Sequence, residues 1–494
     1  MLLERLTQHF HRLRQSAFLV GLLSLAWFAL RTGTKPSRAV YPCQRSAAAN
    51  SYMWLTVYIL PFLSLVSRKA SIGLNRRAII AASVIIVVAA SVTYWGFPEM
   101  WGRKGQSETN LTLNEMGATS QPASDIYVVD DTTGNDGGFA RLISLMDENG
   151  LLFYASPEAG KGRGPYGLIA RDDVVIIKVN SQWDERGGTN TDLLKAVIQA
   201  IMEHPDGFIG EIVVADNGQA QYGSAPGGGG SLDYDRNNAE NTSQSVQDVV
   251  DHFSGSHKVS TYLWDTITTR RVSEYFEGDA EDGYVVNATV NDNTGIMVSY
   301  PKFRTKFGTY VSFRLGIWSP QKRIYDSNRL KVINMPVLKS HSGYGVTAAV
   351  KHYMGVVSDK LTAQLGGRAH QTVGRGGMGT EMVETRFPVL NILDAIWVNA
   401  LPGNGPGTSY SEAARTNIVA ASTDPVALDY WGAKYILLQV AQNKGYTGAS
   451  SIDPDNTASG SFGDWLRLSM QEIANAGYRA TVDESRMNVF IANE

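Results

Sequence analysis

The sequence predicts an α/β fold in which helices cover both faces of a mostly parallel sheet, preceded by N-terminal transmembrane helices. Two observations predict the sheet: continuous apolar runs rich in Val and Ile, such as DVVIIKVN at 173–180, and amphipathic helical segments that alternate with them. A run that is apolar at nearly every position is typical of a strand buried on both faces. A third observation, long uncharged apolar stretches near the N-terminus, predicts the membrane region.

Three apolar segments lie within residues 1–97, at 17–30, 52–66 and 78–97. The third segment has the roughly 20 residues that a spanning helix needs, carries no charge, and ends in an aromatic pair suited to the membrane interface. The first two segments are shorter, so a re-entrant or interfacial hairpin is the alternative for each. We therefore expect a membrane protein whose partner is the lipid bilayer.

The charge is distributed unevenly along the chain. Residues 1–77 contain eleven Lys and Arg against one Glu, and the remainder carries 33 basic against 46 acidic residues, a formal charge of −13. The basic residues directly before 78–97 predict a cytoplasmic start and an extracytoplasmic domain after it, although the loop after 17–30 is equally basic. The acidic balance of the remainder argues against a nucleic-acid partner.

Residues 98–123 are polar without a sustained period and predict a linker, after which residues 124–494 predict the α/β domain. The stretch 265–328 is rich in Thr, Tyr, Phe and Asn, departs from the strand–helix alternation, and predicts a β-rich insertion. The remaining expected strands follow the same apolar pattern and lie at 209–218, 258–264, 329–339 and 417–421.

Polar residues gather where four of the expected strands end. In open α/β sheets, ligands bind beyond the carboxyl ends of the strands, so we expect these side chains to meet at one edge. They are Lys178, Asn180, Asp216, Asn217, Lys339, His341, Thr423 and Asp424. Asp, Asn and Thr also cap helices and turns, and capping is the alternative for Asp424. Asn190 or Thr191 is likewise expected to cap the helix that follows the strand at 173–180. Lysine is a poor cap, which favours a binding role for Lys178 and Lys339.

The stretch VLKSHSGYGVTAAVKHYMG at 337–355 concentrates positive charge. A helix beginning near Gly345 would place Thr347 and Lys351 on one face and direct backbone N–H donors at the same ligand. These groups predict a site for an anionic small molecule. If the protein is an enzyme, His341 or Asp216 is the candidate base.

Two alternatives remain open for the histidines of this region. His341, His352 and His370 could bind a metal with a carboxylate, but their spacings match no compact ligand motif and the lysines would repel a cation. They could equally be hydrogen-bonded within turns. The nearby GRGGMG at 374–379 matches a dinucleotide fingerprint by letter, but no apolar strand precedes it, and a glycine-rich active-site loop is expected instead.

Several segments together resemble the domain-of-unknown-function 362 family. They are "IIKVN" with "GGTNTDLLKAVIQAI", "NMPVLKSHSGYGVTAAVKHYMGVV", "PVLNILDAIWVNALPGNGPG" and "NIVAASTDPVALDYWGAKYI", in this order across residues 173–440. The head segment "GTKPSRAVYPCQRSAAAN" is similar to that of membrane-attached members. The resemblance implies that the family's recurring polar positions are Lys178, Asn180, Lys339, His341, Thr347, Lys351, Asp394 and Asp424.

The resemblance also implies limits. Family members often occur beside ferredoxin-like modules with clustered cysteines, but the one cysteine here, Cys43, cannot hold an iron–sulfur cluster. A redox role would need a separate redox protein as partner, and the cofactor is unknown. Two classes stay open: a redox or group-transfer enzyme acting on an anionic substrate, and a membrane-tethered protein that binds an anionic ligand or metal without catalysis.

Overall fold

The computed structural model describes residues 123–219 and 229–492. The predicted membrane segments 17–30, 52–66 and 78–97, and nearly all of the predicted linker, lie outside these residues. Within the described ranges, no helix is both long enough and apolar enough to cross a membrane.

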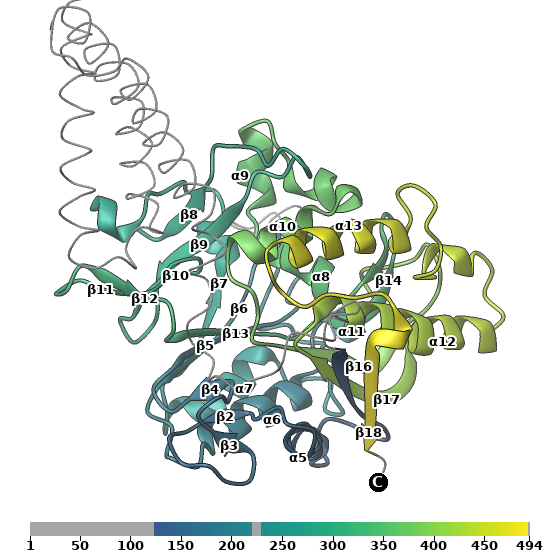
Figure 1. Cartoon of the computed structure of the whole chain (residues 1–494), viewed down its shortest axis with the longest axis horizontal. Helices are drawn as coiled ribbons and strands as arrows, with labels where there is room; N and C mark the ends of the chain where they lie inside the picture. The colour runs from purple at the N-terminus through teal and green to yellow at the C-terminus, as the bar shows by residue number, and fades with distance from the viewer. Residues whose placement is uncertain (1–122, 220–228, 493–494) are drawn as a thin grey trace, which may run out of the picture. The chain divides into compact units, whose positions relative to one another are not determined.

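A mixed, mostly parallel sheet of ten strands forms the centre of the described chain (Figure 1). In spatial order its main path is β18 (Met487–Ala492), β1 (Ser124–Val129), β17 (Ala414–Ser422), β16 (Leu390–Asn399), β13 (Leu330–Asn334), β5 (Val174–Lys178), β6 (Glu211–Asp216) and β7 (Val259–Leu263). All neighbours on this path are parallel except β17, which runs antiparallel to both β1 and β16.

The antiparallel direction of β17 corrects one prediction. The end of β17 lies at the edge of the sheet where the parallel strands begin, so Thr423 and Asp424 are not with the ends of β5 and β6. A strand covered on both faces is apolar at nearly every position whether it runs parallel or antiparallel, so its sequence does not show its direction. The strand expected at 329–339 is also broken, into β13 and β14 (Val337–His341), and Lys339 and His341 lie on β14. Three of the four expected strand ends share an edge of the sheet, and the end of β17 does not.

Alternate residues of the central strands enter two separate cores. In β5, Val174 and Ile176 pack into one apolar cluster, and Val175 and Ile177 pack into the other. The second cluster is covered by α5 (Gly138–Glu148), α6 (Thr191–Met202) and α7 (Val246–Ser254). The first is covered by α8 (Ala349–His352), α10 (Gly377–Glu384), α11 (Pro425–Gly432) and α13 (Phe462–Asn475). Figure 1 shows α5–α7 below the sheet and α10, α11 and α13 above it.

The stretch expected to be β-rich contains a second, antiparallel sheet of five strands. Its strands are β12 (Ile324–Asp326), β11 (Gly316–Ser319), β10 (Tyr310–Ser312), β9 (Ser299–Arg304) and β8 (Gly283–Val286). The insertion leaves the main sheet after β7 and returns into β13, and its aromatic and aliphatic side chains join the first apolar cluster. A small sheet formed by β2 (Tyr154–Ala155), β3 (Arg163–Gly164) and β4 (Ile169–Ala170) precedes β5.

Two helix starts follow the chemistry expected from the sequence. The Asn190 side chain accepts hydrogen bonds from the first N–H groups of α6, at Asp192 and Leu193, and Asp424 does the same for α11. Each side chain satisfies donors that a helix cannot satisfy internally. For Asp424, the capping alternative is therefore the one observed.

Two local predictions around the glycines are wrong. The expected helix from Gly345 is instead a short strand, β15 (Gly345–Thr347), and α8 begins only at Ala349. Gly345 has a φ of +76°, which a helical residue does not adopt. The GRGGMG segment enters the buried helix α10, where a Cβ on Gly379 would lie 2.5 Å from the carbonyl oxygen of Ser469 in α13. These glycines permit close helix packing.

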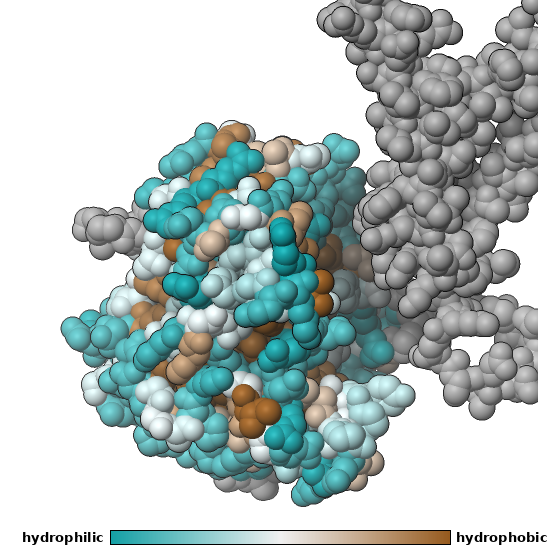
Figure 2. Space-filling model, turned by 90° about the vertical axis from the view of Figure 1, so that its left-hand side faces the viewer, coloured by the Kyte–Doolittle hydropathy of each residue, from teal (hydrophilic) through white to brown (hydrophobic). Residues whose placement is uncertain are grey.

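Hydrophilic residues cover most of the face shown in Figure 2, and apolar residues are scattered among them. The large apolar side chains that are exposed come from separate parts of the chain, including Tyr166, Ile209 and Ile491. Scattered apolar residues are ordinary on protein surfaces and do not by themselves indicate a partner.

Candidate functional site

The carboxyl ends of β5 and β6 meet in a buried ion pair. Lys178 Nζ lies 2.8 Å from Asp216 Oδ1, and both side chains are almost fully buried. The other oxygen of Asp216 accepts hydrogen bonds from the backbone N–H and the hydroxyl of Ser181, at 2.8 and 3.0 Å. Lys178 and Asp216 thus satisfy each other, and a carboxylate held by three donors is poorly suited to act as a base.

The last residue of a 3-10 turn closes over this ion pair. The turn comprises Tyr353–Gly355, directly after α8. A Cβ placed on Gly355 would lie 2.2 Å from Asp216 Oδ1 and 2.5 Å from Lys178 Nζ. A side chain at this position would displace one of the two charged groups, so the ion pair is closely packed under the turn.

The hairpin of β14 (Val337–His341) and β15 brings together a second group of polar side chains. Lys339 pairs with Thr347 across the hairpin and with Asn399 in the neighbouring β16, and His341 pairs with Gly345. Directly paired residues, and residues two apart on one strand, project from the same face of a sheet. Lys339, His341, Thr347 and Asn399 therefore share one face.

Lys351 of α8 joins this group. Its ammonium lowers the pKa values of Lys339, His341 and His370 by charge repulsion, so each of these three residues lies within electrostatic range of Lys351. Its Nζ lies 5.3 Å from the ring centroid of Tyr344, in the turn of the hairpin. We define the lysine cluster as Lys339, His341, Thr347, Lys351 and Asn399.

Several polar atoms of the lysine cluster have no partner. Thr347 Oγ1 and Asn399 Nδ2 are buried without a hydrogen bond. Lys351 is 5% exposed, and its Nζ has no hydrogen bond or ion pair to the described residues but lies over the ring of Tyr344. Lys339 Nζ donates to the carbonyl oxygen of Gly187. An unsatisfied buried polar group costs about 1–3 kcal/mol, so each of these atoms needs an explanation, and a bound ligand would supply one.

Burial changes the protonation of the two lysines. Loss of solvent lowers the pKa of Lys351 to about 7. The pKa of Lys339 also falls to about 7, first through burial and then through repulsion by Lys351, although Asp216 and Asp394 partly oppose this. Burial and mutual repulsion thus both favour the loss of a proton from this pair of lysines.

The histidine of the cluster is neutral. Burial, and then repulsion by Lys351, His370 and Lys339, lowers the pKa of His341 to about 2. Its Nδ1 accepts the backbone N–H of Gly343 at 3.0 Å, which assigns the ring proton to Nε2. His341 can therefore donate one hydrogen bond through Nε2, but it does not take up a proton near neutral pH.

Asp394 lies in β16, on the same strand as Asn399. It is fully buried and accepts hydrogen bonds from the backbone N–H groups of Asn190 and Ile396, at 2.8 and 3.3 Å. Burial raises its pKa to about 6. Asn180, at the end of the β5 run, is half-buried, and its Oδ1 has no hydrogen-bond partner.

Asp424 lies elsewhere. Besides capping α11, it accepts hydrogen bonds from the hydroxyl of Ser124 and the backbone N–H of Thr481, at 2.6 and 3.0 Å. Asp424 thus links β1 to the C-terminal segment through hydrogen bonds. This position does not support the predicted role of Asp424 in ligand binding. The reason is again the antiparallel direction of β17.

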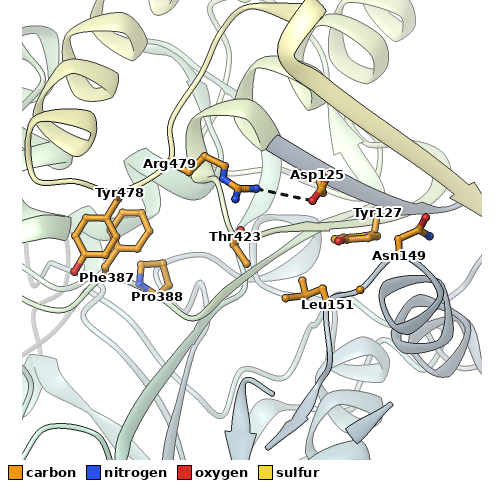
Figure 3. Close-up of a pocket in the computed structure, with 10 residues that line it drawn as sticks. Asp125, Tyr127, Asn149, Leu151, Phe387, Pro388, Thr423, Tyr478 and Arg479 are labelled. Atoms are coloured by element: carbon orange, nitrogen blue, oxygen red, sulfur yellow. Dashed lines mark ion pairs between the residues drawn. The ribbon is translucent and has the colours of Figure 1, made fainter. Parts of the chain in front are cut away.

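A cavity of about 440 Å³ opens at this opposite edge of the sheet (Figure 3). Arg479 faces Asp125 at 3.9 Å, and the rings of Phe387 and Tyr478 stack with centroids 4.0 Å apart. Thr423 lies between these two groups. None of the residues predicted to bind the ligand lines this cavity, so it is distinct from the lysine cluster.

The metal alternative finds no support in the described residues. Among them, no three His, Cys, Asp or Glu side chains are grouped in a way that could hold a metal ion. His352 is buried between Asn334 Oδ1, at 2.7 Å from Nδ1, and the carbonyl of Val179, at 2.9 Å from Nε2. For His352, hydrogen bonding within the fold is therefore the observed role.

The expected helix N-terminus is also occupied. The backbone N–H groups of Ala349 and Val350, at the start of α8, donate to the carboxyl group of Asp429 at 2.6 and 2.9 Å. Burial raises the pKa of Asp429 to about 8. These two donors are therefore not available to a ligand.

Asn399 and Tyr344 lie at the lysine cluster but were not predicted from the sequence. Asn399 closes the apolar run of β16 in the same way that Asn180 follows β5, so the strand-end pattern could have identified it. Tyr344 carried no such signal, because its contact with Lys351 depends on how the hairpin folds back.

The chain is similar to one protein family and to one curated relative. Residues 321–434 match the model of the family described as Domain of unknown function (DUF362). This range contains β14, β15 and α8, with all of the lysine cluster. The thylakoid-associated protein sll1697 of Synechocystis sp. is 33% identical over 129 residues, covering 24% of this chain and 39% of that relative. No solved structure matches the chain significantly.

Proposed function

The chain carries a domain of unknown function 362 at residues 321–434, and from this premise we propose that it is a membrane-tethered protein that binds a small anion at the lysine cluster. The observation that carries the proposal is Lys351, a nearly buried lysine that has no hydrogen bond or ion pair among the described residues and lies within electrostatic range of Lys339. Neither lysine has a carboxylate within ion-pair distance in the described chain, whereas Lys178 does.

The chemistry of the cluster favours an anion over a cation. Its available groups are hydrogen-bond donors: two ammonium groups, the Nε2–H of His341, the hydroxyl of Thr347 and the amide of Asn399. Phosphate and carboxylate oxygens accept hydrogen bonds from all of these groups, and charge-assisted bonds are the strongest of them. An anion would also relieve the repulsion between the two lysines.

Membrane attachment is supported by the sequence and by the relative. The apolar segment 78–97 has the length of a spanning helix, and the similar Synechocystis protein is called thylakoid-associated. The aligned region covers 39% of that relative, so this support concerns association alone. An anion-binding domain tethered in this way would act on molecules near the membrane surface.

Thermal melting of the full chain tests the anion site. Inorganic phosphate or succinate is expected to raise the melting temperature of the wild type, because a ligand that binds only the folded state stabilises it. Lys351→Met keeps the aliphatic stem and removes the charge. The loss of a charge-assisted bond, about 1.5–3 kcal/mol, should weaken binding about tenfold to a hundredfold.

Lys444→Met is the matched control, because Lys444 is exposed at the end of α12 (Leu438–Asn443) and belongs to no cluster. This variant should respond to phosphate as the wild type does. If neither anion shifts the wild-type melting temperature, or if both variants respond equally, the lysine cluster is not an anion site.

A further inference from the structure

We propose that Lys351 is an amine nucleophile that forms an imine with the carbonyl carbon of a small keto acid held by the lysine cluster. The inference rests on the proposed anion site and narrows its ligand to one that carries both a carboxylate and a reactive carbonyl. It assigns Lys351 a covalent role, and it assigns Lys339 the binding of the carboxylate.

Lys351 differs from the other buried lysines. Four lysines are buried in the part of the chain that the structure describes: Lys178, Lys302, Lys339 and Lys351. Lys178 pairs with Asp216, Lys302 donates to the carbonyl of Asp279 at 2.7 Å, and Lys339 donates to the carbonyl of Gly187. Lys351 alone among these four donates to no described oxygen, and this leaves its nitrogen available for reaction.

The surroundings of Lys351 favour the neutral amine. The preceding residues of α8, Ala349 and Val350, are fully buried, and the Lys351 side chain is itself only 5% exposed. Burial lowers its pKa to about 7 against the opposing charge of Asp359, so the neutral amine is accessible near neutral pH. A desolvated lysine beside a second cationic group is the arrangement that activates amines for attack on carbonyls.

Lys339 is suited to the complementary task. It lies in the interior of β14, tethered to the Gly187 carbonyl, so its ammonium is held in place. Thr347 and Asn399 pair directly with it and supply further donors on the same face. The carboxylate of the keto acid, bound at Lys339, would hold the substrate in place. Its negative charge would stabilise the ammonium form of Lys339, so that Lys351 is the lysine that loses its proton.

The covalent step is balanced without any oxidant or reductant. The lone pair of the neutral Lys351 amine forms a bond to the carbonyl carbon, and the electron pair of the C=O bond moves to oxygen, which takes up a proton. The nitrogen loses a proton to give a neutral carbinolamine. The carbinolamine then loses its hydroxyl group together with the remaining proton on nitrogen, as water, and this leaves the neutral imine. The net change is one amine and one carbonyl converted to one imine and one water.

Reductive trapping tests this inference on the wild-type chain. Full-length protein incubated with pyruvate and sodium cyanoborohydride should gain the mass of one reduced pyruvate, and peptide mapping should place the adduct on Lys351. Because the mapping uses the wild type, its outcome does not depend on the folding of a variant. No adduct, or adducts spread over exposed lysines without enrichment at Lys351, would overturn the assignment.

Variants and competitors provide the second readout. Lys351→Arg keeps a positive charge but cannot form the imine, and it should lose the adduct, while Lys444→Met should retain it. Inorganic phosphate should slow labelling by pyruvate more than labelling by the uncharged hydroxyacetone. Equal reaction with both carbonyl compounds would contradict a carboxylate-bearing substrate.

The two proposals fail in distinguishable ways. If phosphate raises the melting temperature but pyruvate leaves no adduct on Lys351, the imine is wrong and the anion site stands. If Lys351 is labelled but no anion shifts the melting temperature, the nucleophile stands without the proposed anion site, and the keto-acid assignment is wrong.

Discussion

Lys339 and Lys351 show how position alters the chemistry of an ordinary residue. Each has a pKa of about 7 in the folded protein, against the usual 10.5, chiefly because burial penalises the charged form. Lys178 is equally buried but keeps Asp216 at 2.8 Å as its counter-ion. Lys178 therefore has a structural role, because Asp216 neutralises its charge. Lys339 and Lys351 have no carboxylate within ion-pair distance among the described residues, so their charges are suited to a ligand.

The shifted lysines predict a pH dependence of stability. Between about pH 7 and 10.5 the unfolded chain keeps a proton on Lys351 that the folded chain has lost, so raising the pH over this range should stabilise the folded state. The slope is at most about 1.4 kcal/mol per pH unit for one lysine. Denaturant titrations of the ligand-free chain from pH 7 to pH 9 measure it, and Lys351→Met should show a shallower slope.

Asp429 contributes in the opposite direction. Its pKa is raised to about 8, so the folded chain holds a proton that the unfolded chain releases, and this favours the folded state less as pH rises towards 8. The comparison between wild type and Lys351→Met cancels this contribution, since both contain Asp429. Equal slopes for the two proteins would show that Lys351 has an ordinary pKa in the fold.

At the scale of elements, three chain segments build the site. The β14–β15 hairpin aligns Lys339, His341 and Thr347, β16 adds Asn399, and α8 adds Lys351. Asp429 of α11 holds the start of α8 through two backbone N–H groups. The position of Lys351 thus depends on a carboxyl group that lies 80 residues beyond Ala349, the first residue of α8.

The turn after α8 gives an element-scale prediction. Gly355→Ala should destabilise the fold strongly, because the new methyl group would lie 2.2 Å from Asp216 Oδ1 and would separate it from Lys178. Breaking a buried ion pair costs about 3–5 kcal/mol. Chemical denaturation should show a loss of this order.

Gly255→Ala is the control for that measurement. Gly255 follows α7 with an ordinary backbone conformation, and a Cβ there would contact nothing within 4 Å. Its substitution should change the free energy of unfolding by less than about 1 kcal/mol. Similar losses for both variants would mean that the packing against the ion pair is not the cause.

The whole molecule combines a predicted membrane region with an α/β domain whose largest sheet is covered on both faces. The five-stranded insertion adds its apolar side chains to one of the two cores, so it is part of the same folded unit. The lysine cluster lies on strands and a helix of this unit, which gives a binding site a rigid support.

Membrane topology is the prediction at this scale. The basic residues before 78–97 predict that the domain lies on the extracytoplasmic side. Protease added to intact cells should therefore digest the domain, while a cytoplasmic marker protein stays whole. Complete protection of the domain until detergent is added would place it on the cytoplasmic side instead.

The sequence by itself determined the local features of this protein. The apolar runs predicted the strands β5, β6, β7 and β13, because a strand buried on both faces is apolar at nearly every position. Asn190 and Asp424 were recognisable as helix caps, because a cap bonds to N–H groups only two or three residues away. The cationic character of 337–355 was equally visible.

Only the tertiary structure decided which polar residues share the site. Lys178 and Asp216 are 38 residues apart, and nothing near Lys178 in sequence shows that its charge is paired. The direction of β17 moved Asp424 to the opposite edge, and the pairing of Lys339 with Thr347 and Asn399 replaced the expected helix. Strand direction and pairing depend on contacts between distant segments, and these contacts leave no periodic pattern in the residues that make them.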